Sequence, residues 1–92
     1  MLIAQVIGTV VATRKHERLV GAKIQVVQPL KPQDKTPQGA PIVAVDAVGA
    51  GVGEQVIIVT GSSARKGVDN DLCPVDAVII GIIDQLEVKG DI

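Results

Sequence analysis

The chain alternates between short apolar runs, rich in Val and Ile, and small clusters of Gly, Pro, Ser and charged residues. Apolar runs of this length and composition are typical of β-strands. The first and last runs are long, and we expect each to bend at its internal glycine, Gly8 or Gly81, where a bulge is easily accommodated. The pattern predicts five strands, over Leu2–Thr13, Lys23–Gln28, Ile42–Val45, Glu54–Thr60 and Asp76–Val88.

The segments between the predicted strands differ in kind. Pro29–Pro41 holds four of the five prolines, and we expect a loop there because proline cannot donate to a strand ladder. Ser62–Lys66 predicts one helical turn, with Ser62 or Ser63 as its N-cap. Polar and apolar residues alternate along Lys23–Gln28, so one face of that strand should lie in water or against another subunit. Five strands with a helical turn before the last are typical of a small Greek-key barrel of the OB type.

Composition predicts that this barrel needs partners. The 92 residues form one domain, 1–92, and a domain of this size buries only about 60 to 65% of the surface of its unfolded chain. There is one cysteine, Cys73, and one histidine, His16, so a disulfide within the chain is impossible and a zinc ion would lack ligands. Phe, Tyr and Trp, which anchor most transient interfaces, are absent. We therefore expect a permanent oligomer held by many small aliphatic side chains.

Charge excludes two classes of partner. Nine basic and ten acidic residues give a net charge of −1, which supplies no field to attract nucleic acid or an anionic membrane. OB barrels that bind single strands also use aromatic platforms and a basic groove, and this chain has neither. With glycine counted, the longest apolar run, Ala77–Ile83, is far shorter than the ~20 residues of a spanning helix, and the first residues do not resemble a signal peptide. We expect a soluble cytosolic protein with no nucleic-acid partner and no membrane.

Two small-residue clusters invite comparison with phosphate-binding loops. Counted from Gly49, a dinucleotide fingerprint needs a glycine where Glu54 stands, and a helix where the next run reads as strand. We expect a tight turn with positive φ instead. The second cluster lacks the Gly-Lys-Ser/Thr ending of a Walker loop. One alternative function stays open there, a small OB-like module that binds an anion or metabolite at the turn formed by Gly61, Ser62, Ser63, Ala64 and Arg65.

Catalytic constellations are not supported by the sequence. The serines of that turn are not in a nucleophile elbow, and His16 is distant in sequence. Cys73 has no basic neighbour in sequence to activate it, so we expect a small, half-buried residue. Three carboxylates interrupt apolar runs: Asp46, Asp76 and Asp84. We expect each to form a cap or a salt bridge, and we favour this role over that of a catalytic acid–base pair. We expect no catalytic residue, no cofactor and no metal.

Several motifs follow one another along the chain and together cover nearly all of it. They are Ile3–Lys15, Leu19–Lys23, Val26–Leu30, Ala44–Gly51, Gly53–Glu54, Val56, Gly61–Arg65, Pro74–Ala77 and Gly81–Asp84. In residues and in order they resemble the bacterial microcompartment vertex proteins, the EutN/CcmL family.

The resemblance implies a structural function. It implies an OB-like barrel that assembles into a closed ring of five and caps the vertices of a polyhedral shell, of carboxysome or metabolosome type, in the bacterial cytoplasm. Hexameric shell proteins would be its neighbours. The Gly61–Arg65 turn would line the axial opening of the ring. The subunit interface would include Asp46, Gly49, Gly51, Gly53 and Asp76.

Overall fold

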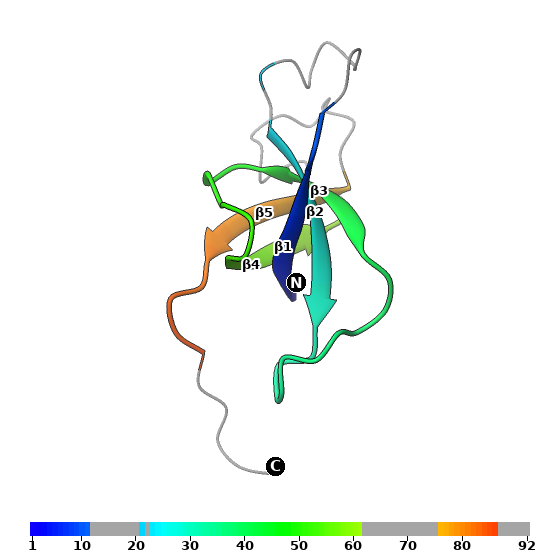
Figure 1. Cartoon of the computed structure of the whole chain (residues 1–92), viewed down its shortest axis with the longest axis vertical. Helices are drawn as coiled ribbons and strands as arrows, with labels where there is room; N and C mark the ends of the chain where they lie inside the picture. Colours follow the sequence, from blue (N-terminus) through cyan, green and yellow to red (C-terminus); the bar gives the residue numbers. More distant parts are fainter. Residues whose placement is uncertain (12–20, 22, 62–75, 87–92) are drawn as a thin grey trace.

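The computed structural model describes residues 1–11, 21, 23–61 and 76–86, and these residues form a β-barrel (Figure 1). Its strands are β1 (Leu2–Val10), β2 (Lys23–Leu30), β3 (Ile42–Asp46), β4 (Gln55–Thr60) and β5 (Ala77–Ile82). The predicted all-β, five-stranded barrel is confirmed. The predicted helical turn over 62–66 lies outside the described residues.

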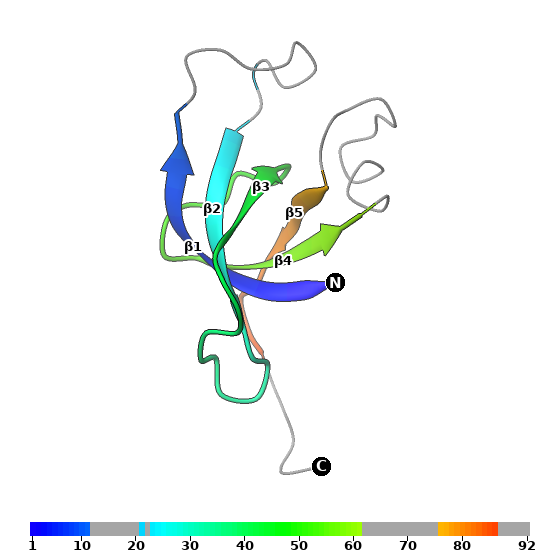
Figure 2. The same ribbon diagram turned by 90° about the vertical axis from the view of Figure 1, so that its right-hand side faces the viewer.

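The barrel closes in the order β1-β2-β3-β5-β4, with β4 paired back to β1. Every neighbouring pair is antiparallel except β3 and β5, which run parallel over a short stretch where Val45 lies opposite Val78. Figure 2 shows the strands curving around the barrel and the 31–41 connection extending beyond one end. In the barrel β5 lies between β3 and β4, although β4 comes first in the chain. The 46–54 connection must therefore pass the position of β5 to join β3 to β4.

Glycine bends both long strands, as predicted. The register of β1 against β2 shifts between Val6 and Gly8. The register of β4 against β5 shifts between Ile57 and Ile58, where Gly81 pairs with Ile57. Each shift is a bulge that tightens the local curvature of the sheet. These two irregularities allow five short strands to close into a barrel.

The strand ends differ from the predicted bounds at several places. β1 ends at Val10 and not at Thr13, with residues 12–13 outside the described residues, and β3, β4 and β5 each differ by one residue at one end. Pro29 and Leu30 were expected in a loop but form the end of β2, with Pro29 opposite Ala4 of β1. Pro29 has no N–H to donate, yet its carbonyl still accepts the N–H of Gln38 at 2.9 Å, so the end of a strand tolerates it. The last strand ends at Ile82, because residues 83–86 leave the sheet. Of the predicted remainder, residues 87–88 lie outside the described part of the chain.

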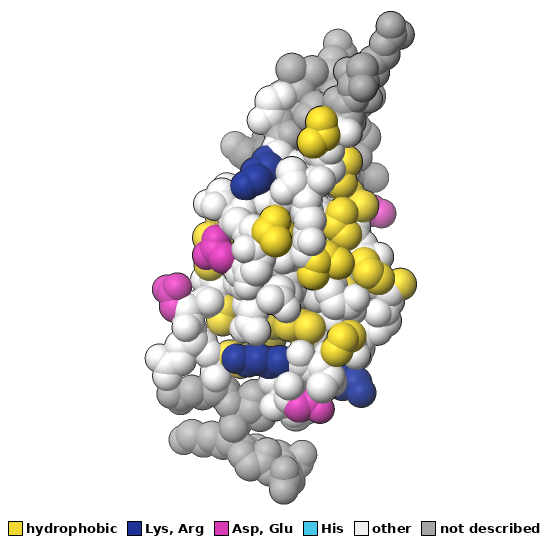
Figure 3. Space-filling model, viewed as in Figure 1, with side chains coloured by type: hydrophobic (Ala, Val, Ile, Leu, Met, Phe, Trp, Pro, Cys, Tyr) yellow, Lys and Arg dark blue, Asp and Glu magenta, His cyan; other side chains and the backbone are white. Residues whose placement is uncertain are grey.

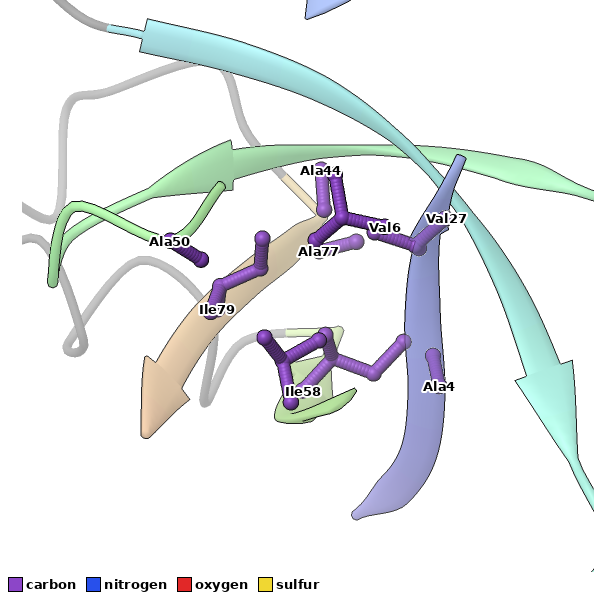
Figure 4. Close-up of a cluster of buried hydrophobic side chains, with 9 residues drawn as sticks. Ala4, Val6, Val27, Ala44, Ala50, Ile58, Ala77 and Ile79 are labelled. Carbon is purple, nitrogen blue, oxygen red and sulfur yellow. The ribbon is translucent and has the colours of Figure 1, made fainter. Parts of the chain in front are cut away.

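The core consists of small side chains that point into the barrel (Figure 4). Its buried members come from all five strands and from the 46–54 connection: Ala4, Val6, Val27, Ala44, Ala50, Val56, Ile58, Ala77 and Ile79. One polar side chain, Gln25 of β2, is fully buried with them. The alternation along β2 thus turns Gln25 inward and leaves Ile24 and Val26 half-buried on the outer side.

Candidate functional site

The 46–54 connection is organised by one carboxylate at the end of β3. Asp46 Oδ1 accepts the backbone N–H groups of Val48 and Gly49, each at 2.9 Å, and Oδ2 accepts the N–H of Ala50 at 2.7 Å. Three successive amides converging on one side chain form a closed turn, because each would otherwise need a separate acceptor. The cap predicted as the expected role of Asp46 is therefore confirmed.

The same turn is held from inside the barrel by β2. Gln25 Nε2 donates to the carbonyl of Ala50 at 2.7 Å and to Asp46 Oδ2 at 3.3 Å, while Gln25 Oε1 accepts from the hydroxyl of Thr9 at 2.8 Å. Lys23 Nζ donates to the Ala50 carbonyl as well, at 2.8 Å. Within the described ranges, every buried side-chain nitrogen and oxygen has a partner. A buried polar group that is fully satisfied fixes geometry instead of destabilising the core.

Hydrogen bonding keeps Asp46 ionised. Partial burial raises the pKa of its carboxyl. Hydrogen bonds from the N–H groups of Val48, Gly49 and Ala50 and from the Gln25 amide together lower the pKa by more than burial raises it, so the pKa lies below its ordinary value of 3.8. Hydrogen bonds donated to a carboxylate favour its charged form. The negative charge that organises the turn is thus present at neutral pH.

The first glycine cluster forms the tight turn that the sequence predicts. Gly49 and Gly53 have positive φ, +81° and +94°, a conformation that side chains with a Cβ rarely adopt. Glu54 Oε1 accepts the N–H of Gly51 at 2.7 Å, and the N–H of Gly53 donates to the Val6 carbonyl of β1 at 2.8 Å. Of the amides that a phosphate would need, those of Gly49, Ala50 and Gly51 are already bound by carboxylates of the chain, and that of Gly53 by a backbone carbonyl. The residues after Glu54 form β4, not a helix.

The second cluster is described only at its first residue. Gly61 follows β4 with φ of +70° and donates its N–H to the carbonyl of Asp76 at 2.8 Å, so this bond links the ends of β4 and β5. The side chains of Asp76 and Asp84 are exposed. The remaining members of the predicted pore or anion turn, and the serine, cysteine and histidine candidates, lie outside the described residues: Ser62, Ser63, Ala64, Arg65, Cys73 and His16.

The described part of the chain does not assemble the acid–base pair considered from the sequence. Asp46 is engaged in its turn, and among residues 1–11, 21, 23–61 and 76–86 no three His, Cys, Asp or Glu side chains gather as metal ligands. In that same part there is no helix of the length and apolarity needed to cross a membrane. Gln25 is the residue that sequence reasoning missed, since the alternation in Lys23–Gln28 does not reveal which face is inside.

Comparisons with known proteins agree across almost the whole chain. A family model described as ethanolamine utilisation protein EutN/carboxysome matches residues 1–84. The bacterial microcompartment shell vertex protein GrpN of Rhodospirillum rubrum is 47% identical over 87 residues, 95% of this chain and 97% of that protein. The carboxysome shell vertex protein CcmL of Synechocystis is 44% identical over 94 residues, 98% of this chain and 89% of that protein. The chain belongs to the EutN/CcmL family.

Solved structures of EutN/CcmL proteins share the barrel. A structure described as the GrpN pentameric microcompartment shell protein from Rhodospirillum rubrum superposes with a TM-score of 0.87 at 45% identity, covering 97% of this chain and 100% of that one. A structure of EutN superposes with a TM-score of 0.91 at 41% identity, covering 96% of this chain and 91% of that one. The resemblance read from the sequence is confirmed, and so is the class of function it implied, a structural protein of a microcompartment shell vertex.

Proposed function

We propose that this chain forms a homopentamer that caps the vertices of a bacterial microcompartment shell in the cytoplasm, beside hexameric shell proteins and without catalysing a reaction. The observation that carries the proposal is the match, at 45% identity over nearly the full length of both chains, to a protein described as a pentameric microcompartment shell protein.

The predicted role of the glycine turns belongs to this proposal. We place Asp46, Gly49, Gly51, Gly53 and Asp76 at the subunit interface, and the Gly61–Arg65 turn at the axial opening. Gly49 and Gly53 already have a reason within the subunit, their positive φ. Gly51 has no positive φ, but an added Cβ would lie 3.3 Å from Glu54 Oε1, which accepts the Gly51 N–H and would have to shift. Gly51→Ala therefore tests the interface only together with circular dichroism that shows the barrel to be intact.

The mass of the native protein tests the proposal directly. Five chains of 9.5 kDa give a ring of about 48 kDa, measured by native mass spectrometry and by light scattering at micromolar concentration. A stable 9.5 kDa monomer would contradict the pentamer. Coexpression with a hexameric shell protein then tests the vertex role: electron microscopy should show closed polyhedral particles with this chain and open or tubular sheets without it. Closed particles in both cases would contradict the capping function.

A further inference from the structure

The glycines of the described chain, apart from Gly51 in the 46–54 connection, fall into two groups. Five have positive φ and stand in turns: Gly21, Gly39, Gly49, Gly53 and Gly61. Gly8 and Gly81 stand inside strands and have no positive φ. A Cβ added at Gly8 would meet only Val26 at 3.9 Å, and one added at Gly81 would meet only Ile57 at 3.7 Å, both ordinary contacts.

The bulges beside Gly8 and Gly81 are one reason for glycine at these positions, but no described atom of the subunit is close enough to exclude a Cβ there. Glycine inside a strand is destabilising relative to alanine. Glycine in a strand often marks a bulge, and it also marks places where another backbone comes close. The space beside each of these glycines leaves room for such an approach. The surroundings of both positions point the same way.

Gly8 lies at the edge of an apolar area on the outer side of β1, β2 and β3. It pairs with Val26, which pairs with Val43, and the neighbouring row pairs Val10 with Ile24. These side chains point outward, since Gln25 and Val27, which alternate with Ile24 and Val26 along β2, are buried, and the bulge after Val6 places Gly8 and Val10 opposite the outward pair. Val43 is 53% exposed, and Figure 3 shows hydrophobic side chains gathered along one side of the molecule. We call this area the Gly8 face: Gly8, Val10, Ile24, Val26 and Val43.

Gly81 ends a second outward row, which crosses four strands. Leu30 pairs with Ile3, Ile3 with Ile57, and Ile57 with Gly81. The first three line a hollow of about 410 Å³, whose wall is mostly apolar and includes Ile83 and Leu86. Ile80, next to Gly81, is 39% exposed. We call this second area the Gly81 face: Leu30, Ile3, Ile57, Ile80 and Gly81.

The two faces are different patches. They meet β1 at Gly8 and at Ile3, five residues apart, which is about 17 Å along an extended strand. One carries the exposed Val43 beside half-buried Val10 and Val26, and the other contains a hollow. A rotationally symmetric ring is built from a head-to-tail contact between two unlike patches of each subunit, whereas a two-fold dimer uses one patch twice. The surface thus offers what a ring needs.

We propose that the Gly8 face of one subunit packs against the Gly81 face of the next, with the β-branched side chains around Val43 seated in the hollow beside Ile57. This inference rests on the proposed function, whose pentamer supplies the second copy as the occupant of both faces. Gly8 and Gly81 are the points of closest approach between neighbouring backbones. The absence of aromatic side chains fits, because two flat areas of Val and Ile pack closely without large anchors.

Gly8→Val and Gly81→Val test the contact. Within a subunit the new side chain at Gly8 gains a cross-strand partner in Val26, so the far-UV circular dichroism of β-structure should persist. In the ring it meets the neighbouring backbone and overpacks the contact. We expect each variant alone to run at 9.5 kDa and the wild type at about 48 kDa.

Mixing the two variants tests the pairing itself. Gly8→Val keeps an intact Gly81 face and Gly81→Val keeps an intact Gly8 face, so one good contact can form between them and no more. At high micromolar concentration the mixture should give a heterodimer of two 9.5 kDa chains, about 19 kDa, in native mass spectrometry. Two monomeric variants that never form this dimer would overturn the pairing of the faces.

Charged substitutions at exposed positions test the same contact if a glycine variant does not fold. Val43→Glu should abolish the ring, whereas Ala40→Glu, also at an exposed position but outside both faces, should leave it intact. A pentameric Gly81→Val would overturn the inference, because the neighbouring backbone would then not approach at Gly81. If the wild type is a pentamer while Val43→Glu is too, the inference fails and the proposed function stands; a monomeric wild type removes both.

Discussion

Replacing Asp46 by asparagine removes the charge that organises the 46–54 turn and keeps its size. In Asp46→Asn, one side-chain oxygen can still accept from Val48 and Gly49, but the other position becomes an NH₂ that faces the N–H of Ala50 and the amide of Gln25. A part-buried N–H left without an acceptor costs about 1 to 3 kcal/mol, and hydrogen bonds to a neutral acceptor are about half as strong as those to a carboxylate. We expect the free energy of unfolding to fall by about 2 to 4 kcal/mol.

Urea unfolding followed by circular dichroism measures this loss. The chain has no Trp, Tyr or Phe, so intrinsic fluorescence gives no signal. With an m-value of roughly 1 to 1.5 kcal/mol/M for a chain of this size, the midpoint should fall by about 2 M or more. Both proteins must be compared at the same chain concentration, because association stabilises the folded state by mass action.

Asp84→Asn is the matched control. Asp84 is exposed and follows the last strand, and substitutions at such positions usually change stability by less than about 0.5 kcal/mol. If Asp46→Asn changes the free energy of unfolding no more than Asp84→Asn does, the carboxylate does not hold the turn and the account of this site is wrong.

Three further predictions follow from the same contacts. Because the folded pKa of Asp46 lies below 3.8, the stability that its charge contributes is complete above that pH and is lost as the pH falls through the folded pKa. The difference in urea midpoint between wild type and Asp46→Asn should therefore shrink from pH 7 to pH 3. A constant difference would contradict the assignment. Gln25→Leu should lower the free energy of unfolding by less than about 1 kcal/mol, since the Ala50 carbonyl keeps Lys23 as a donor and the exposed Thr9 hydroxyl can bind water. Gln25→Ala should lower it by about 2 to 4 kcal/mol, because it opens a cavity in the core. Equal losses of stability in circular dichroism melts would refute this. Calorimetric titration with phosphate and sulfate should give no binding heat, because the amides of the first glycine cluster already bind Asp46 and Glu54, and heat that disappears in Arg65→Ala would instead support the anion-binding alternative.

Local pattern was enough to predict the barrel. Runs of Val and Ile separated by glycine and proline determine where strands start and stop, and the bulges at Gly8 and Gly81 follow from the glycines within the runs. Pro29 is the exception. The rule that excludes proline from a ladder applies to its missing N–H, while the structure uses its carbonyl at the end of β2.

The interior of the site could not be predicted in the same way. Gln25 is buried because Ala50 and Asp46, more than twenty residues away in sequence, offer it partners, and no periodicity within β2 contains that information. The glycines pose a similar difficulty. A sequence does not distinguish Gly53, which needs positive φ, from Gly81, which does not, although the first serves the turn and the second leaves space on the surface.

β3 shows why the barrel cannot be considered alone. Its residues Ile42, Val43, Ala44 and Val45 are all apolar, whereas a strand with one face in water alternates apolar with polar side chains. Ala44 faces the core, yet Val43 points outward and is 53% exposed. Continuous apolar runs are typical of strands that are buried on both faces. The core covers one face of β3, and the Val43 side is the part of the surface where the proposed neighbouring subunit would complete the burial that this run indicates.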